Sequence, residues 1–354
     1  MLGIALISIV IGSRSQNLFR VVEGEKRGFI DSTGHVVVSP RFRYAEDFSN
    51  SLALVSARMP IEESDSAPTS WGYIDSTGAM RLHPRFGYGR SFSEGLAAVR
   101  ENDPGTLTNS IWGFIDTTGH AAIVPQYYSV GDFSEGLAWV QTQRRLFLFN
   151  LTDKFGYVNK KGNLVIPARF EQAGNFSEGL APVRVDGKLG YIDRYGTEII
   201  PPQFEMGSGF SEGMARVKAG ARWGYINRKG NFIIPPGFED CRDFSGGLAL
   251  VQDSGRWGFI NRAGKYLITP AYSKAASFTE GLAPVLIDGR WGYIDTTGQT
   301  VLPPRYEEAG KFRKGLAWVR LGEMTGYINH GGVFIWDTGL RQFTRRLDRQ
   351  NASK

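Results

Sequence analysis

Residues 180–213 read LAPVRVDGKLGYIDRYGTEIIPPQFEMGSGFSEG and contain one complete repeat. Its first segment is extended and ends at Asp186-Gly187, a dipeptide that suits the two φ > 0 positions of a hairpin turn. Residues 188–193 return as a second strand. An Asx–glycine turn follows, and residues 197–200 form a third strand. The stretch therefore predicts a three-stranded meander with a loop or a short fourth strand.

Prolines and aromatic residues limit how these strands are placed. Pro201 and Pro202 cannot donate to a ladder, so we expect them to end the third strand. For the same reason, Pro182 in this repeat and Pro284 in a later one predict that the first strand is an edge strand. Both faces of the second strand are apolar, because side chains alternate along it. One meander cannot bury both faces, so stacking of neighbouring repeats must stabilise it.

The same pattern recurs along almost the whole chain. The motif W-G-[YF]-[IV]-[DN]-x-x-G, with its Trp replaced in some copies, has its first glycine at Gly28, Gly72, Gly113, Gly156, Gly190, Gly224, Gly258, Gly292 and Gly326. Spacings are 44, 41 and 43, then 34 five times. A block similar to F-S-E-G-L-A-x-V begins twenty positions after each glycine except the last. With Leu18–Val21 standing in for L-A-x-V, nine units run from about residue 18 to 340.

These repeats resemble the WG-repeat family. The residues that carry the resemblance are WGYID at 71–75 and 291–295, FSEGLA at 176–181, and IIPP at 199–202 and 233–236. Arg27, Phe155, Leu189 and Thr325 stand where the motif has Trp. The resemblance implies an all-β repeat protein. It implies no shared enzymatic activity and no common ligand.

Two arrangements of such units are compatible with the sequence. One is a propeller-like or spiral array of meanders, and the other is an open β-superhelix. Propellers commonly have four to eight blades, and this chain has nine units, the last without its Pro-x-aromatic and F-S-E-G parts. The sequence alone does not decide whether the array closes.

Composition excludes several functional classes. The chain has 354 residues with 42% hydrophobic residues, which excludes a disordered protein, and its 45 glycines exclude a coiled coil. One cysteine and four histidines predict neither a disulfide framework nor a metal site, and no cofactor motif is present. Of the net charge of +6, the tail 341–354 carries +4 and Arg14 carries one more. The repeats therefore lack the basic stripe that nucleic-acid binding needs.

The chain divides into a leader at 1–17, a single repeat domain at 18–340 and a basic tail at 341–354. Leu2–Gly12 is an uncharged apolar run of eleven residues, which is too short to span a membrane. It has the length of a signal-peptide core but lacks a preceding Lys or Arg. It is equally compatible with an extra strand packed on the first repeat, and both interpretations stay open. The leader favours export to the cell envelope over a cytoplasmic location, and both stay open; membrane contact is expected only through an uncleaved leader.

Repeated polar residues are expected to shape turns and not to catalyse a reaction. The Glu of S-E-G recurs at Glu94, Glu135, Glu178, Glu212 and Glu280. A catalytic pair needs two carboxylates in different environments, whereas uniform recurrence favours a turn. Asp and Asn interchange in [DN]-x-x-G, as a turn cap permits. Cys241 fills a slot that holds small residues elsewhere, so a buried, inert thiol is predicted.

Tryptophan recurs in register, which favours packing between repeats over sugar stacking. The residues concerned are Trp71, Trp112, Trp223, Trp257 and Trp291. Trp139 and Trp318 occupy the variable position of L-A-x-V instead. We expect these two to be more exposed and better placed to contact a ligand.

Three consecutive units carry insertions between their first and second strands, at 57–70, 101–110 and 141–154. Insertions on one face of a repeat array often form its binding surface. The candidate binding residues are Arg58, Glu62, Glu63, Asp103, Arg144, Arg145, Phe147 and Phe149, together with Trp139. We expect a monomeric, non-catalytic module that binds a protein or a cell-envelope glycan. A structural scaffold is the first alternative, and a hydrolase or lyase is the second.

Overall fold

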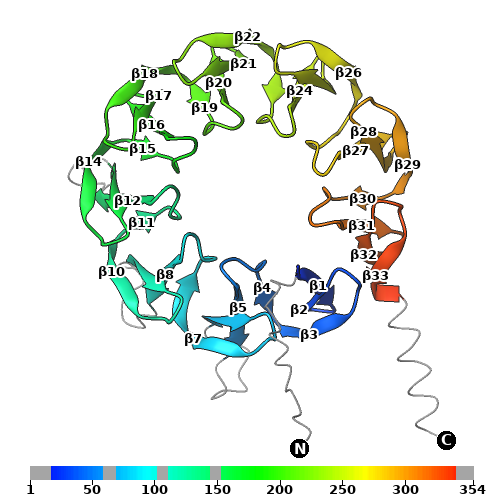
Figure 1. The fold of residues 1–354 in the computed structure, drawn as a ribbon, viewed down its shortest axis with the longest axis horizontal. Coiled ribbons are helices and arrows are strands. Elements are labelled where there is room, and N and C mark those ends of the chain that lie inside the picture. Colours follow the sequence, from blue (N-terminus) through cyan, green and yellow to red (C-terminus); the bar gives the residue numbers. More distant parts are fainter. Residues whose placement is uncertain (1–16, 59–68, 102–110, 144–152, 340–354) are drawn as a thin grey trace, which may run out of the picture.

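The computed structural model describes residues 17–58, 69–101, 111–143 and 153–339. In this part of the chain, small antiparallel sheets stand side by side as nine blades of a ring, so that the first blade lies next to the last (Figure 1). The expected all-β array of meanders is confirmed. The ring corresponds to the propeller-like arrangement and not to an open superhelix.

Each blade runs from the inside of the ring outward as a short inner strand, a first long strand, a middle strand and an outer strand. The short inner strands are β4 (Tyr44–Ala45), β11 (Ser129–Val130), β15 (Gln172–Ala173), β19 (Met206–Gly207), β23 (Asp240–Cys241) and β30 (Glu308–Ala309). The first long strands are β1 (Phe19–Glu23), β5 (Leu52–Arg58), β8 (Leu96–Glu101), β12 (Leu137–Gln143), β16 (Leu180–Val185), β20 (Met214–Ala219), β24 (Leu248–Asp253), β27 (Leu282–Ile287) and β31 (Ala317–Leu321).

The middle strands contain the W-G motif, and the outer strands follow the [DN]-x-x-G turn. The middle strands are β2 (Lys26–Ile30), β6 (Thr69–Asp75), β9 (Trp112–Asp116), β13 (Lys154–Asn159), β17 (Lys188–Asp193), β21 (Arg222–Asn227), β25 (Arg256–Asn261), β28 (Arg290–Asp295) and β32 (Met324–Ile328). The outer strands are β3 (Val36–Phe42), β7 (Met80–Gly89), β10 (Ala121–Tyr127), β14 (Leu164–Phe170), β18 (Glu198–Phe204), β22 (Phe232–Phe238), β26 (Tyr266–Tyr272), β29 (Thr300–Tyr306) and β33 (Phe334–Asp337).

Three blades depart from the four-strand pattern. In blade 3, the end of β7 serves as the inner strand, since Gly89 pairs with Val99. In blade 8, a single bridge between Ala275 and Val285 takes that place. Blade 1 contains β1, β2 and β3, and no described strand pairs with the inner edge of β1.

The two expectations drawn from proline are wrong in detail. The outer strand β18 does not end at Pro201 but continues to Phe204. It can do so because it is the outermost strand, where a missing N–H costs no ladder hydrogen bond. The first long strand β16 is not an edge strand, because β15 and β17 flank it. Pro182 is tolerated since β15 pairs only with Val183 and Arg184.

The glycine of W-G is required by the way the outer strand crosses the middle strand. In blade 5, Leu189 pairs with Phe204 and Tyr191 pairs with Ile200, so the outer strand has extra residues opposite Gly190. A Cβ on Gly190 would lie 2.6 Å from the carbonyl oxygen of Ile200. The glycine of W-G and the backbone of the I-P-P segment are therefore in close contact with each other.

Aromatic residues join each blade to the next. Tyr191 of blade 5 packs edge-to-face on Phe210, which begins the F-S-E-G block ahead of the first long strand of blade 6, at 5.1 Å between ring centroids. The buried Tyr191 hydroxyl donates a 2.8 Å hydrogen bond to the backbone oxygen of Ser208. The same bond, seventeen residues forward, recurs from Tyr73, Tyr157, Tyr225 and Tyr293. Each repeat thus supplies the partner that its predecessor needs.

The ring closes through a modified form of this contact. Tyr327 of blade 9 donates a 2.8 Å hydrogen bond to the backbone oxygen of Arg20 in blade 1. Its ring lies 5.6 Å from that of Phe19. Phe19 is buried in a cluster that includes Leu316 and Trp336 of blade 9. The first and last blades are therefore packed together, which is the part of the fold that the sequence left open.

Candidate binding face

The F-S-E-G turns connect neighbouring blades, and their glutamates are used in these connections. All five Glu residues have positive φ values between 51° and 54°, which confirms their predicted place in a turn. The Glu94 carboxylate accepts hydrogen bonds from the N–H groups of Glu135 and Gly136 in the next turn, at 2.7 and 3.0 Å. Glu212 accepts the equivalent bonds from Gly246 and Gly247.

The serine of F-S-E-G makes a second connection of the same kind. Its hydroxyl donates to the backbone oxygen of the Phe in the next F-S-E-G turn, over distances of 2.6–3.3 Å. The donors are Ser49, Ser93, Ser134, Ser177, Ser211 and Ser245. These bonds show that the repeated polar groups hold blade to blade.

The [DN]-x-x-G residues cap turns, as predicted. The Asp193 carboxylate accepts from the backbone N–H groups of Tyr195 and Thr197, both at 2.9 Å. Asn227 does the same with Lys229 and Asn231. Only one side-chain oxygen is used in each case, which explains why Asp and Asn interchange.

We expect acid to weaken the connections between blades. Burial raises the pKa of Glu94, but hydrogen bonds from Lys160 and from the Gly136 and Glu135 amides outweigh it and hold the pKa below its ordinary value of 4.5. A carboxylate whose pKa is lower in the folded protein than in the unfolded chain stabilises the fold at pH values above its unfolded pKa. This stabilisation is lost as the pH falls through the folded pKa. Urea unfolding should therefore show Glu94→Gln to be less stable than the parent at pH 7. The two should converge below the folded pKa of Glu94; a gap that persists there would contradict this role.

Cys241 has the surroundings of a structural thiol. Cys241 is fully buried, and burial raises the pKa of its thiol to about 11, as expected for an inert cysteine. No group of three or more His, Cys, Asp or Glu residues in the described ranges could hold a metal ion. The same part of the chain has no helix long and apolar enough to cross a bilayer.

A row of exposed and half-buried aromatic side chains crosses blades 2 and 3. It consists of Tyr44, Trp71, Tyr88 and Trp112, which we call the aromatic ladder. Successive ring centroids are 4.9, 5.2 and 5.7 Å apart. Tyr88 is 42% exposed, and the other three are half-buried. The predicted packing of Trp71 and Trp112 between repeats is confirmed, but both rings also remain accessible to solvent.

The aromatic ladder lies next to the hairpin ends that carry the first two insertions. Tyr44 and Trp71 pair with Ser56 from its two sides, two residues before β5 ends at Arg58. Tyr88 and Trp112 flank Arg100 in the same way, one residue before β8 ends. The aromatic ladder therefore lies beside the ends of β5 and β8, which are the last described residues before the first two insertions.

Two arginines lie over the rings of the aromatic ladder. The Arg100 guanidinium lies 5.9 Å from the ring centroids of both Tyr88 and Trp112, and that of Arg90 lies 5.2 Å from Trp112. Such cation–π contacts hold the guanidinium groups over the aromatic rings. At the other end, Tyr44 donates a 2.7 Å hydrogen bond to Glu46, which raises the pKa of the phenol.

Later blades lack the aromatic ladder and hold their hairpins differently. Position 44 of the first unit corresponds to Gln172, Met206, Asp240, Lys274 and Glu308 in later units. One position earlier, Glu171, Glu205, Glu239 and Glu307 accept hydrogen bonds from hairpin glycine N–H groups of the next blade. The corresponding residues before the three long hairpins are Arg43, Gly87 and Tyr128. The three hairpins with insertions thus lack this glutamate and have aromatic residues nearby, but the short hairpin of blade 8 lacks it as well, with Ser273 at that position.

Most of the sequence-predicted site lies outside the described residues. This holds for Glu62, Glu63, Asp103, Arg144, Arg145, Phe147 and Phe149. Arg58 is the last residue of β5. Trp139 is half-buried on β12, with its ring 5.7 Å from that of Phe155, and a Cβ on Gly131 would collide with its indole. Trp139 therefore packs within blade 4 and is not part of the aromatic ladder.

Tyr44, Tyr88, Arg90 and Arg100 are not among the binding residues that the sequence predicts. A signal was present for the two tyrosines, because Tyr stands at this position of the unit only in the two units that precede the first two insertions. The two arginines had no such signal, since Arg242 stands at the position of Arg90 and Arg184 at that of Arg100.

Solved structures that are similar to this chain include three with TM-scores below 0.5. The apo AztD structure from Citrobacter koseri shares 12% identity, over 80% of this chain and 92% of that chain, with a TM-score of 0.43. Hsv2 from Kluyveromyces lactis shares 11% over 57% of this chain and 75% of that one, with a TM-score of 0.36. The C-terminal WD40 domain of Sif2 shares 10% over 77% and 80%, with a TM-score of 0.35. No curated protein matches the chain.

The family model described as WG containing repeat matches the chain eight times. The matched residues are 28–57, 71–103, 112–143, 155–188, 190–221, 223–257, 257–291 and 291–324. These matches cover most of the repeat domain, and the match at 190–221, for example, runs from the middle strand of blade 5 to the first long strand of blade 6. The chain therefore belongs to the WG containing repeat family.

Proposed function

We propose that the protein is a non-catalytic binding module whose first blades engage a protein or a cell-envelope glycan. The observation that carries this proposal is the aromatic ladder beside the hairpin ends of the long insertions. Half-exposed aromatic rings, with guanidinium groups beside them, suit stacking against sugar rings or against planar and apolar protein groups. Later blades keep Arg–Trp contacts, such as that of Arg242 with Trp257, but they have no tyrosine at the position of Tyr44 and Tyr88.

The environment of the repeated carboxylates supports a non-catalytic role. General acid–base catalysis needs carboxyl groups placed in contrasting environments. Here Glu135, Glu178 and Glu280 accept hydrogen bonds from backbone N–H groups of the next blade. A carboxylate held in this way connects one blade to the next. We therefore place the function in recognition, and a hydrolase or lyase is the less favoured alternative.

The partner that we propose is a protein or glycan met outside the cytoplasm, bound by a monomer. Nucleic acid is not included, because positive charge is concentrated in the tail at 341–354 and not in a stripe along the repeats. A scaffold attached through this basic tail is the first alternative function. It differs from the binding module because it needs no ligand on the first blades.

Trimming the insertions is expected to abolish capture of a partner. The variant replaces residues 59–68, 102–110 and 144–152 with two-residue Asp-Gly turns, and circular dichroism checks that it folds. It is compared with the parent in pull-downs from source-cell lysate and envelope fractions. A control carries Gly/Ser segments of the original lengths, which separates loop sequence from loop length. Capture by the parent alone supports the proposal. Equal capture by all three contradicts it, and no capture by any favours the scaffold.

A further inference from the structure

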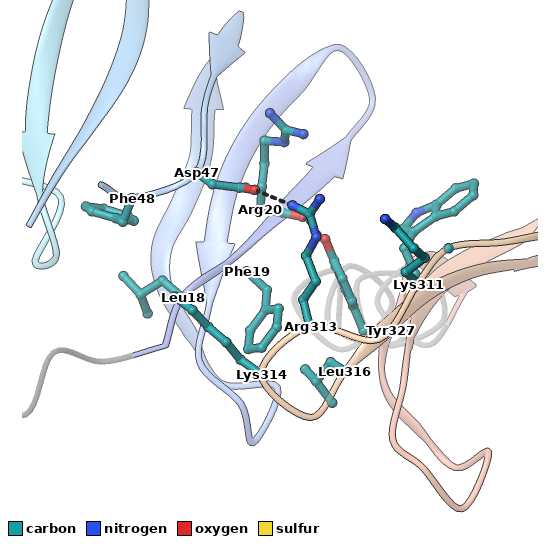
Figure 2. A pocket seen from close by; sticks show the side chains of 12 residues that line it. Leu18, Phe19, Arg20, Asp47, Phe48, Lys311, Arg313, Lys314, Leu316 and Tyr327 are labelled. Carbon is teal, nitrogen blue, oxygen red and sulfur yellow. Dashed lines mark hydrogen bonds and ion pairs between the residues drawn. The ribbon is translucent and has the colours of Figure 1, made fainter. Parts of the chain in front are cut away.

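A cavity of about 460 Å³ lies at the junction of blade 9 with blade 1 (Figure 2). Arg313 and Lys314, in the F-S-E-G equivalent of blade 9, form one wall. Asp47 and Phe48, at the F-S-E-G equivalent of blade 2, form another. The Arg313 guanidinium lies 3.8 Å from the Asp47 carboxylate and joins these two walls. Ligand pockets commonly have volumes of about 300–1,000 Å³, so this cavity has the size of a binding site.

Two aromatic residues of the cavity are more exposed than their equivalents at the other junctions. Phe48 and Tyr327 are both half-buried. The Phe of every other F-S-E-G turn is buried, namely Phe92, Phe133, Phe176, Phe210, Phe244, Phe278 and Phe312. The G-[YF] residues that correspond to Tyr327 are buried as well, namely Phe29, Tyr73, Phe114, Tyr157, Tyr191, Tyr225, Phe259 and Tyr293. The cavity therefore presents apolar surface that the other junctions bury.

The F-S-E-G turns show how such a surface receives a carboxylate. In five of them, the N–H of the residue after the Glu position accepts the Glu side chain of the preceding turn as its partner, at 2.9–3.0 Å. The donors are Gly136, Gly179, Gly213, Gly247 and Gly315. Successive backbone N–H groups in such turns form a concave site for an anion. The turn is thus a carboxylate receptor that recurs around the ring.

In blade 2 the same receptor is formed by the N–H groups of Asn50 and Ser51. Their φ values are 48° and 68°, so the backbone has the positive φ of the turns that bind a carboxylate. Within the described ranges, no side chain supplies a carboxylate to Ser51. Gly281 of blade 8 also lacks one, because Gly246 stands at the Glu position of blade 7. Ser51, however, follows three residues after Phe48, which lines the cavity.

The wall on blade 9 carries cations where other turns have Ser and Glu. Arg313 stands at the Ser position and Lys314 at the Glu position, from which the side chains of other blades reach toward the next turn. Lys311 lines the cavity too. Asp47, the acidic residue among the described lining residues, is already paired with Arg313. A carboxylate between blades 9 and 2 is therefore attracted from both sides.

Phe19 restricts the residue that precedes the carboxylate-bearing one. The other eight units have Ala at its position, and there the ring of the next F-S-E-G turn packs on the G-[YF] aromatic. At the junction, the Phe19 ring itself lies 5.6 Å from that of Tyr327. A segment that enters the cavity therefore has a small residue where F-S-E-G has its Phe.

We propose that this cavity binds an acidic peptide segment of a partner protein, in which a Ser-Glu-Gly turn lies between the turns of blades 9 and 2. The Glu carboxylate of the peptide accepts from the N–H groups of Asn50 and Ser51, and Lys314 lies on its other side. The described F-S-E-G turns of this chain are held between its own blades, so the peptide comes from another protein. The cavity shares no lining residue with the aromatic ladder, and the inference does not depend on the proposed function.

Fluorescence anisotropy with the full chain tests the choice of ligand. The probe is a Gly-Ala-Ser-Glu-Gly peptide with a dye at its N-terminus and an amidated C-terminus, and the matched probe has Gln in place of Glu. We expect the Glu peptide to bind at least about tenfold more tightly, because hydrogen bonds from N–H groups to a carboxylate are charge-assisted. Lys314→Glu should weaken its binding by about tenfold. Lys229→Glu, in an exposed turn of blade 6, changes the net charge equally and should leave binding near the parent value.

Amide proton resonances locate the peptide without any substitution. The Ser51 resonance should shift when the Glu peptide is added, whereas that of Gly281, which also lacks a carboxylate partner in the described chain, should stay in place. Equal binding of the two peptides, equal weakening by the two lysine variants, or equal shifts of the two resonances would overturn the inference. So would the absence of binding by the Glu peptide at millimolar concentration.

Discussion

Gly224→Ala is expected to destabilise the protein by about 3 kcal/mol, because it forces backbone against backbone. A Cβ at this position would lie 2.6 Å from the oxygen of Ile234, 2.7 Å from the nitrogen of Pro236 and 2.9 Å from the carbonyl carbon of Pro235. All three atoms belong to the outer strand that crosses the middle strand here. A flexible side chain could move aside, but a crossing strand must shift as a whole.

The matched control is Gly255→Ala in a hairpin turn. Gly255 has a φ of +72°, and an added Cβ would have no other atom within 4 Å, so only the conformational penalty of about 1 kcal/mol applies. Urea unfolding of the two variants should give clearly different losses of unfolding free energy. Equal losses would show that the outer strand does not cross at Gly224 as described.

Phe19→Ala is expected to cost about 3 kcal/mol, although alanine is the residue that the other eight units have at this position. In those units the space beside the G-[YF] aromatic is filled by the Phe of the next F-S-E-G block, as Phe312 fills it at 5.0 Å from Tyr293. The first unit has Arg14 at that position of the sequence. Phe19 is 7% exposed and lies 5.6 Å from Tyr327, so it replaces the missing ring from another position.

Thermal unfolding and hydrogen exchange of the strands at the junction measure this effect. Faster exchange in β1 and β31 than in β20 would show that the ring opens first between blades 9 and 1. A substitution chosen to match the repeat consensus would ordinarily be neutral or stabilising. A neutral Phe19→Ala would therefore contradict the closure through Phe19 and Tyr327.

The local structure of the repeat was predictable because its determinants lie within one unit. Asp186-Gly187 sets the hairpin, Asp193 caps the following turn, and alternation places Tyr191 inside. The predictions from proline were wrong, because a missing N–H indicates a place without a ladder hydrogen bond but does not identify which strand of the blade is the edge strand. Pro201 lies in the true outer edge strand, whereas Pro182 lies beside a short inner strand that a single unit did not clearly predict.

Contacts between units could not be assigned from a periodic sequence. Glu94 was correctly placed in a turn, but its partners Glu135 and Gly136 belong to the following unit. With every residue repeated, spacing does not distinguish a contact within a unit from one between units. Ring closure was inaccessible for a further reason, since it depends on Arg20 and Tyr327, which are 307 residues apart.

The candidate site could be predicted only in its general location. Three consecutive insertions identified the first blades, yet most of the predicted contact residues lie outside the described ranges. The aromatic ladder arises because the short inner strands place Tyr44 and Tyr88 on the same first long strands as the two tryptophans. Tyr44 and Trp71 flank one residue of β5, and Tyr88 and Trp112 flank one residue of β8. This arrangement depends on the short inner strand, which the sequence left as an alternative to a loop.

The most direct test of the binding face compares two pairs of tryptophans at the same position of the repeat. Trp71→Ala with Trp112→Ala removes two rings of the aromatic ladder, whereas Trp223→Ala with Trp257→Ala removes two rings from blades 6 and 7. Co-sedimentation with the insoluble envelope fraction of the source cells, or pull-down of the protein captured by the parent, measures binding. The first pair should weaken binding by at least about tenfold, and the second should leave it near the parent value. Equal weakening by both pairs, or a larger effect from blades 6 and 7, would contradict a binding face on the first blades.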